Sequence, residues 1–313
     1  MGYDISKICS KAPAITESAG VVYDERIADY FGHYGLDAEA DMAGVEHLFG
    51  TFESKGRKLA GHIYRPSDYE ATVIVLHGYL NHSGQVKNLI KHLLGEGYAV
   101  AAFDLPGHGL SEGSRALIDD FAEYSTAMMD FYEVVRGKLD GPYHVVGFST
   151  GASAMIDYLL VSDECVFDKV VMASPLVHST SWWWARLGYT IYKPFRKSVP
   201  RVPRENSSDK EFIEFNRTED YLHARRVPME WVGALHKWNT KIKGLGPCDK
   251  EMLVLQGNRD KTVDHKYNIQ FIKKKFTNAE VHTIDTGRHE LFNESEKLRS
   301  QVFSRIDDYL RHE

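Results

Sequence analysis

The chain has 313 residues with 38 Lys and Arg against 44 Asp and Glu, a net charge of −6, and 43% of its residues are hydrophobic. This hydrophobic fraction supports a globular core of ordinary size and argues against a disordered or fibrous protein. The excess of acidic residues argues against a nucleic-acid partner, which would call for a basic face. The three cysteines lie far apart, without CxxC spacing, and suit a reducing compartment.

We expect no secretory signal peptide at the N-terminus, although Met1-Gly2 with Ser6 fits the short N-myristoylation pattern. Lys7, Lys11 and Glu17 interrupt the stretch in which a signal peptide would be apolar, and no apolar run approaches the ~18 residues that span a bilayer. We therefore expect a cytoplasmic protein, with peripheral contact with a membrane left open. We expect residues 1–46 to form a polar N-terminal extension with a helical tendency, and apart from that short pattern they contain no recognisable sequence motif.

Strand and helix patterns alternate through the first half of the chain. Two strand-like runs between residues 47 and 66 flank Ser54-Lys55-Gly56-Arg57 and predict a hairpin. Strands are then expected at 72–76, 99–103, 143–146 and 169–173, and helices at 83–95, 121–135 and 149–161. This alternation predicts right-handed crossovers and a mainly parallel sheet, an α/β fold with helices on both faces.

The alternation stops after Pro175 and returns at residue 252, with strands expected at 252–255 and 280–284 and helices at 264–276 and 295–311. The interval 176–246 is too long for a plain loop and contains all five tryptophans. We expect residues 47–175 and 247–313 to form the core. Residues 176–246 are expected to form an inserted lid, after the fourth parallel strand.

A G-x-S-x-G sequence, Gly147-Phe148-Ser149-Thr150-Gly151, lies between an expected strand and an expected helix. In this context the serine occupies a sharp turn, where its hydroxyl stands clear of the sheet. The helix N-terminus adds free N–H groups and a positive dipole end. Ser149 is therefore the candidate nucleophile, and the alternative is a tight turn with an idle serine.

A serine hydroxyl is a weak nucleophile that needs a base, itself oriented by an acid. With this motif the chain order is serine, acid, histidine. Asp260 follows the strand after the interval 176–246, and His289 follows the last strand, so we expect these two. Asp264 is a rival acid, but it stands where it would cap the next helix. His282 lies within a strand and is expected to be packed or exposed.

The oxyanion of an acyl-transfer intermediate needs two N–H donors. We expect one from the backbone of Thr150, just after the nucleophile, and the other from Tyr79, on the loop after the strand 72–76. For the side chains of His77 and Tyr79, loop packing and a direct role both stay open.

Several sequence blocks together resemble a known family; they are His77-Gly78, Asp104-Leu105-Pro106-Gly107-His108-Gly109 with Ser111, Gly147 to Gly151, Gln256-Gly257-Asn258-Arg259-Asp260 and Gly287-Arg288-His289-Glu290. Over about residues 47–312 the chain is similar to the monoacylglycerol lipase and lysophospholipase group of α/β-hydrolases. The resemblance implies the α/β-hydrolase fold, a triad of Ser149, Asp260 and His289, and Tyr79 and Thr150 as oxyanion donors. Phe148 and residues 1–45 depart from the family pattern. The turn at residues 106–109 is expected to be structural.

These features predict a serine hydrolase without a cofactor, which cleaves carboxylic esters through an acyl-enzyme and acts on monoacylglycerol or lysophospholipid. Thioesterase, peptidase and acyltransferase reactions use the same triad and stay open, as does a non-catalytic binding protein of this fold. The histidines do not group at metal-ligand spacing, and no phosphate-binding glycine loop occurs, so we expect no metal.

The segment from Leu176 to Arg204 contains no Asp or Glu, although it is rich in basic and aromatic residues. The candidate substrate-binding residues in it are Trp182, Trp183, Trp184, Arg196 and Lys197. One interpretation is that the segment contacts an amphiphile or an anionic membrane surface. The other is that the aromatic residues pack the lid onto the core while the cations face water.

Overall fold

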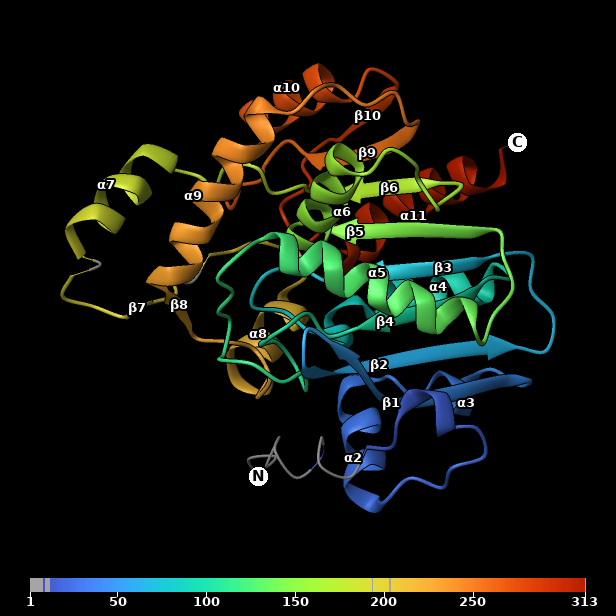
Figure 1. The fold of residues 1–313 in the computed structure, drawn as a ribbon. Helices are drawn as coiled ribbons and strands as arrows, with labels where there is room; N and C mark the ends of the chain where they lie inside the picture. Colours follow the sequence, from blue (N-terminus) through green and yellow to red (C-terminus); the bar gives the residue numbers. More distant parts are fainter. Residues whose placement is uncertain (1–7, 9–11, 193, 203, 313) are drawn as a thin grey trace.

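The computed structural model describes residues 8, 12–192, 194–202 and 204–312. An eight-stranded sheet with the order β1-β2-β4-β3-β5-β6-β9-β10 runs through its centre (Figure 1). The strands are β1 (Val45–Ser54), β2 (Arg57–Pro66), β3 (Thr72–Leu76), β4 (Ala99–Phe103), β5 (Tyr143–Phe148), β6 (Val170–Ala173), β9 (Met252–Gly257) and β10 (Ala279–Ile284). From β4 to β10 the strands pair in parallel, which confirms the predicted α/β fold.

The first two strands form the predicted hairpin, and β2 pairs antiparallel with β4. The turn of the hairpin consists of Lys55 and Gly56, which have φ angles of 48° and 72°. Two successive residues with positive φ are typical of the turn whose twist matches that of a two-stranded ribbon.

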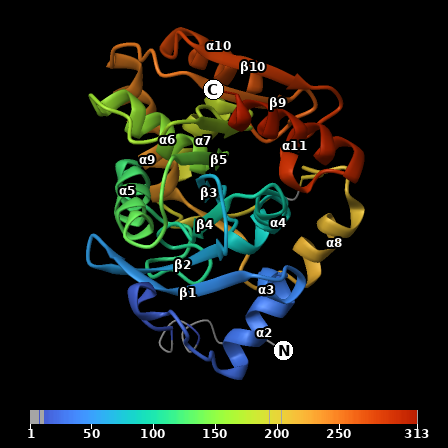
Figure 2. The ribbon, with the colours of Figure 1, turned by 90° about the vertical axis from the view of Figure 1, so that its right-hand side faces the viewer.

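Successive side chains of a strand point to opposite faces of the sheet, and here both faces are buried in a hydrophobic core. In β3, Ile74 and Leu76 join the core on one face, and Val73 and Val75 join the core on the other. Helices α5 (Ala122–Arg136), α6 (Thr150–Val161) and α10 (His265–Lys275) cover the first face; α2 (Glu25–Tyr34), α4 (Lys87–Gly95) and α11 (Glu296–Arg311) cover the second (Figure 2).

The N-terminal segment contributes α2 to the core, with a 3₁₀ turn η1 (Ile15–Glu17) before it and α3 (Ala38–Asp41) after it. The Asp24 side chain caps α2 by accepting the N–H groups of Arg26 and Ile27. Gly35 ends the helix in the left-handed conformation, with φ = 65°. The buried stripe of α2 consists of Ile27, Tyr30, Phe31 and Tyr34. The sequence predicted only a helical tendency here.

The long segment between β6 and β9 folds as α7 (Trp182–Tyr192), β7 (Ser198–Pro200), α8 (Lys210–Thr218), β8 (Arg226–Pro228) and α9 (Met229–Gly244), and we call it the insertion. β7 and β8 form a small antiparallel ribbon. Trp238 and Lys241 of α9 both donate to the Asp157 carboxylate on α6, at 3.1 and 2.9 Å. α9 is thus fixed to the core, whereas α7 packs on α9 and projects outward (Figure 1).

Candidate active site

Ser149 occupies a tight turn between β5 and α6. Its backbone has φ = 52° and ψ = −105°, a region that a residue with a Cβ rarely adopts. A Cβ at Gly147 would lie 2.3 Å from the sulfur of Met155, and a Cβ at Gly151 would lie 2.6 Å from the backbone oxygen of Leu76. Only glycine at these two positions therefore lets the helix, the strand and the turn approach so closely.

The three residues expected to form a triad lie in one hydrogen-bonded chain. His289, on the loop after β10, has its Nε2 3.1 Å from the Ser149 Oγ. Its Nδ1 lies 2.7 Å from Oδ2 of Asp260, on the loop after β9. All three side chains are buried, with at most 5% of each residue exposed. This arrangement allows a proton to pass from the serine to the imidazole.

Asp260 is held in place by further donors. Its Oδ1 accepts the N–H groups of Thr262 and Val263, and its Oδ2 accepts from the Gln256 amide at 3.0 Å. Burial opposes ionisation, but His289 and the N–H donors outweigh it and hold the pKa of Asp260 below its usual range. Burial likewise disfavours the imidazolium of His289, but the Asp260 carboxylate outweighs it and raises the pKa of His289.

The rival residues have other roles. Asp264 accepts the N–H of Tyr267 at 3.2 Å and caps α10. His282 pairs with Glu280 on the edge strand β10. Neither takes part in the hydrogen-bonded chain of Ser149.

Two backbone N–H groups beside Ser149 are available to an oxyanion. Within the described chain, no backbone carbonyl accepts the N–H of Tyr79 or of Thr150. The loop that carries Tyr79 runs close to the nucleophile, since a Cβ at Gly78 would lie 2.8 Å from the Phe148 ring and 3.2 Å from the Ser149 Cβ. The two N–H groups therefore remain candidate donors for an oxyanion hole.

The side chains of this loop fix its shape. Burial lowers the pKa of His77 to about 3, so the ring is neutral, and its Nε2 accepts the N–H of Leu105 at 2.9 Å. The Tyr79 hydroxyl donates to the carbonyl of Ala116 at 2.8 Å, and its ring stacks on Trp231 of α9 at 3.6 Å. These contacts hold both side chains in place on the loop, and Tyr79 also lines the cavity beside Ser149.

The turn at residues 106–109 has a structural role, as expected. The Asp104 carboxylate accepts N–H groups from Ser83 and Leu110, both at 2.7 Å. A Cβ at Gly109 would lie 2.0 Å from that carboxylate, which explains the glycine. The turn thus ties the loops after β3 and β4 together.

A cavity of about 380 Å³ opens at Ser149 and His289. Most of its wall is apolar and comes from the Tyr79 loop, the serine turn and the insertion; these residues are Tyr79, Leu80, Phe148, Leu176, Trp182, Val199, Pro200, Val202, Val227, Trp231, Val232, Leu235 and Val263. The polar part includes Arg201, Asn206 and Glu290. An apolar wall with a few polar groups is typical of a small-molecule site.

Glu290 is the centre of the polar part. Its Oε1 accepts from the amides of Asn81 and Asn206, at 3.3 and 3.2 Å, and its Oε2 from that of Asn293 at 3.3 Å. Burial raises the pKa of this carboxyl group. Arg201 also lines the cavity, and its guanidinium makes no hydrogen bond or ion pair with any described residue. The sequence did not predict these residues, although Glu290 adjoins His289.

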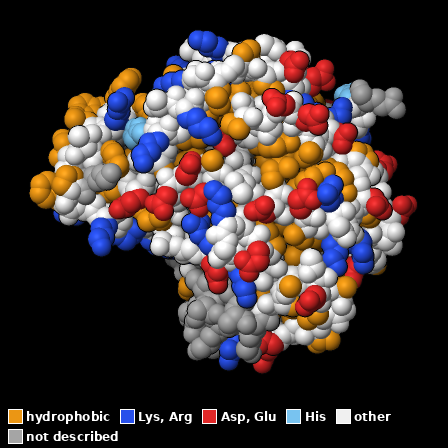
Figure 3. Space-filling model, viewed as in Figure 1, with side chains coloured by type: hydrophobic (Ala, Val, Ile, Leu, Met, Phe, Trp, Pro, Cys, Tyr) orange, Lys and Arg blue, Asp and Glu red, His pale blue; other side chains and the backbone are white. Residues whose placement is uncertain are grey.

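The five predicted substrate-binding residues are separated by the structure. Trp182 is 6% exposed and lines the cavity. Trp183 and Trp184 are 72% and 75% exposed on α7, and Arg196 and Lys197 are exposed beyond its end. Hydrophobic side chains gather on this projecting part of the surface (Figure 3). Among the residues that the structure describes, none of the helices combines the length and the apolar composition of a membrane span.

One group in the described part of the chain has the spacing of a metal site. His92, Glu96 and Asp307 lie together on α4 and α11. His92 bonds Asp307 at 2.9 Å, and Glu96 pairs with Arg311. These pairings account for the group, and we assign no metal to it. Cys165 and Cys248 are free thiols, and Cys9 lies outside the described residues.

Comparisons with known proteins agree with this architecture. Residues 67–296 match the family described as serine aminopeptidase, S33. The monoglyceride lipase homolog of monkeypox virus is 23% identical over 257 residues, covering 79% of this chain and 92% of its own. Phospholipase YtpA of Bacillus subtilis is 25% identical over 243 residues, which cover 74% of this chain and 92% of the phospholipase.

A solved structure supports the fold. The soluble variant of monoglyceride lipase from Saccharomyces cerevisiae, in complex with a substrate analog, superposes with a TM-score of 0.73 at 18% identity, covering 86% of this chain and 96% of that one. The predicted resemblance is therefore confirmed. The chain belongs to the serine aminopeptidase S33 family of hydrolases and has the α/β-hydrolase fold.

Proposed function

We propose that this protein is a serine hydrolase that cleaves carboxylic esters of lipid-like substrates, with monoacylglycerol or lysophospholipid as the substrate class. The observation that carries the proposal is the hydrogen-bonded chain from Ser149 through His289 to Asp260 at the wall of a largely apolar cavity. The names of the relatives, monoglyceride lipase and phospholipase, support the same chemistry.

In the first half of the proposed reaction, Ser149 Oγ attacks the ester carbonyl carbon while its proton passes to His289 Nε2. Asp260 accepts the hydrogen bond of Nδ1–H and stabilises the imidazolium. The carbonyl oxygen becomes an oxyanion, which accepts hydrogen bonds from the N–H groups of Tyr79 and Thr150.

In the second half, the imidazolium gives its proton to the departing alcohol oxygen and leaves an acyl-enzyme on Ser149. His289 then takes a proton from water, the hydroxide attacks the acyl carbon, and the returning proton restores the serine as the carboxylic acid leaves. The apolar wall suits the acyl chain. Because Glu290 adjoins the histidine that protonates the alcohol, its polar neighbourhood suits the alcohol part of the substrate.

We further propose that residues 176–246 act as a lid that meets a lipid surface, in a cytoplasmic protein with peripheral membrane contact. Exposed apolar side chains cluster on and after α7; they are Trp183, Trp184, Leu187, Ile191 and Phe195. Tryptophan favours the membrane interface, and each nearby cation adds about 1 kcal/mol on an anionic surface. Arg196 and Lys197 would then act at the surface, while Trp182 acts in the cavity.

A substrate panel tests the proposal. The panel compares p-nitrophenyl esters of increasing chain length, monoacylglycerols, lysophospholipids, acyl thioesters and aminoacyl amides, with Ser149→Ala as the blank. We expect kcat/KM to rise with acyl length and the lipids to be turned over only by the wild type. A preference for amides or thioesters, or equal turnover by Ser149→Ala, would overturn the proposal.

A further inference from the structure

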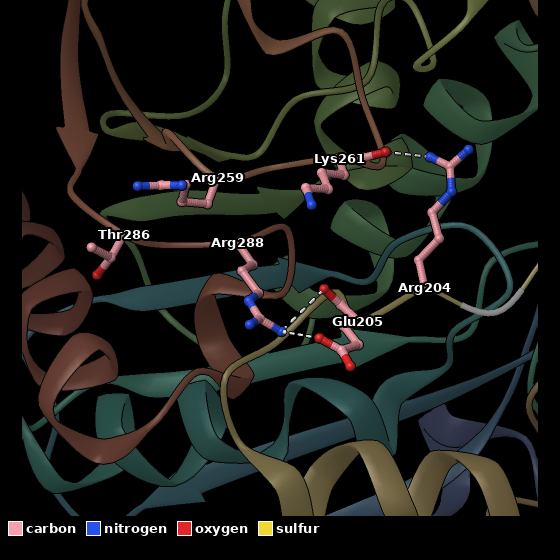
Figure 4. A pocket seen from close by; sticks show the side chains of 6 residues that line it. All are labelled: Arg204, Glu205, Arg259, Lys261, Thr286 and Arg288. Atoms are coloured by element: carbon pink, nitrogen blue, oxygen red, sulfur yellow. Dashed lines mark hydrogen bonds and ion pairs between the residues drawn. The ribbon is translucent and has the colours of Figure 1, made fainter.

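A second cavity, of about 680 Å³, adjoins the active-site cavity and is strongly basic (Figure 4). Its lining consists of Arg204, Glu205, Arg259, Lys261, Thr286 and Arg288. Four cations against one carboxylate give a local charge of +3, in a chain whose net charge is −6. Like charges gathered in a hollow attract an anion, which would relieve their mutual repulsion.

Two of the four cations are already engaged. Arg288 donates to the Glu205 carboxylate at 3.3 Å and to the carbonyl of Ser207 at 2.8 Å. Arg204 donates to the carbonyl of Lys261 (Figure 4). These bonds hold both guanidinium groups at the cavity wall and leave part of each fork unused.

The other two cations keep their full set of donors. The side chains of Arg259 and Lys261 make no hydrogen bond or ion pair with any described residue. Figure 4 shows both at the same cavity, with no interaction drawn from either side-chain end. A ligand that entered the cavity would therefore find an unshared guanidinium and an unshared ammonium group.

The lining joins three segments that also build the active site. Arg259 and Lys261 are the chain neighbours of Asp260, and Arg288 is the neighbour of His289. Arg204 belongs to the insertion and lines both cavities. An anion seated here would bridge the loops of the acid and the base and the inserted segment.

We propose that this basic cavity binds a phosphate-bearing anion, either a lipid headgroup phosphate or a soluble phosphate. Phosphate presents several acceptor oxygens and more charge than a carboxylate, and the guanidinium fork matches its geometry. The Thr286 hydroxyl is a further donor at the wall. The inference goes beyond the proposed function, because it concerns binding at a cavity that does not contain Ser149.

Calorimetric titration at low ionic strength tests the site. The probes are inorganic phosphate and sn-glycerol 3-phosphate, titrated into Ser149→Ala protein and the same protein with Arg259→Ala/Lys261→Ala. Hydrogen bonds to charged groups are each worth about tenfold in affinity, so we expect the pair of substitutions to weaken binding by tenfold or more. Because binding is measured without turnover, a failure here is distinct from a failure of the proposed hydrolysis.

A matched control separates the site from net charge. Lys273→Ala/Lys274→Ala removes two cations from the exposed side of α10, and we expect affinity within about twofold of the parent, since screening limits distant surface charges. The melting temperature without ligand checks that each variant folds. Should the double variant unfold, Arg259→Gln and Lys261→Gln are titrated singly.

A sedimentation arm distinguishes the two sources of phosphate, using phosphatidylcholine vesicles with and without phosphatidic acid. Binding of the soluble phosphates, weakened by the Arg259 and Lys261 substitutions, supports a soluble ligand. Binding only to vesicles that carry phosphatidic acid, weakened by the same substitutions, supports a headgroup. Binding to neither, or binding that the substitutions leave intact, overturns the inference.

Discussion

Replacing Asp260 by asparagine tests how the acid controls the imidazole. The Asp260 Oδ1 accepts the N–H groups of Thr262 and Val263, at 2.7 and 3.1 Å, while Oδ2 faces His289 Nδ1 at 2.7 Å. An asparagine keeps both backbone bonds only with its carbonyl oxygen at the Oδ1 position. Its NH₂ group then faces the imidazole and the Gln256 amide, so Nδ1 must accept a hydrogen bond and not donate one.

The size of the effect follows from the tautomer. An imidazole that accepts at Nδ1 carries its proton on Nε2, where it cannot take the proton of Ser149. The substitution also removes the charge that raises the pKa of His289. In a serine protease triad the equivalent loss costs about 10⁴-fold in kcat, or about 5 kcal/mol of transition-state stabilisation. We expect a loss of that order in kcat/KM.

The assay is hydrolysis of a short soluble p-nitrophenyl ester, with the melting temperature as a check on folding. Asp264→Asn is the matched control, because the same change is made where the carboxylate only accepts the N–H of Tyr267 as a helix cap. Asparagine caps nearly as well, so we expect wild-type turnover and a stability loss below about 1 kcal/mol. Inactivity of Asp264→Asn, or near-normal turnover by Asp260→Asn, would refute the reasoning.

Three further predictions follow from the same geometry. In steady-state kinetics, Ser149→Ala and His289→Ala should each lower kcat by several orders of magnitude. The double variant should lose little more, because the two residues act as a unit, and additive losses would contradict this. The neutral ring of His289 is the base, and Asp260 raises its pKa, so kcat/KM should fall toward acid pH with a midpoint above about 6.5. A lower midpoint would be inconsistent with the pairing of His289 and Asp260. Arg196→Glu/Lys197→Glu should weaken sedimentation with anionic vesicles and raise KM for lipid substrates far more than for a short soluble ester, and equal effects on both would refute the surface role.

The strands of the core were predictable because burial on both faces leaves a continuous apolar, β-branched run. All five residues of Thr72–Leu76 are buried, for example, and the run and the strand coincide. The carboxyl ends of parallel strands meet at one edge of a sheet. The positions of Ser149, Asp260 and His289 after three such strands therefore led to the expectation that they meet.

The insertion was less predictable, because its contacts depend on how helices pack. Neighbouring residues of a helix point about 100° apart, so Trp182, Trp183 and Trp184 cannot all face one surface. Which of them faces the cavity depends on the packing of α7 against α9, and local sequence does not encode that. Arg201 and Asn206 reach the cavity from irregular segments, which carry no periodic signal.

The N-terminal helix α2 did leave a signal in the sequence. Its buried residues Ile27, Tyr30, Phe31 and Tyr34 stand at helical spacing after Asp24, a capping residue. The local sequence does not show which residues this stripe packs with. They come from the sheet and from α4 and α11, which lie far along the chain.

Covalent labelling of Ser149 tests the central claim most directly. A fluorophosphonate is mixed with the wild type, Ser149→Ala and His289→Ala, and the labelled peptides are identified by mass spectrometry. We predict a single label on the peptide that contains Ser149, none in Ser149→Ala, and much slower labelling in His289→Ala, since the imidazole activates the hydroxyl. A label on another residue, or unchanged labelling of Ser149→Ala, would contradict the assignment of the nucleophile.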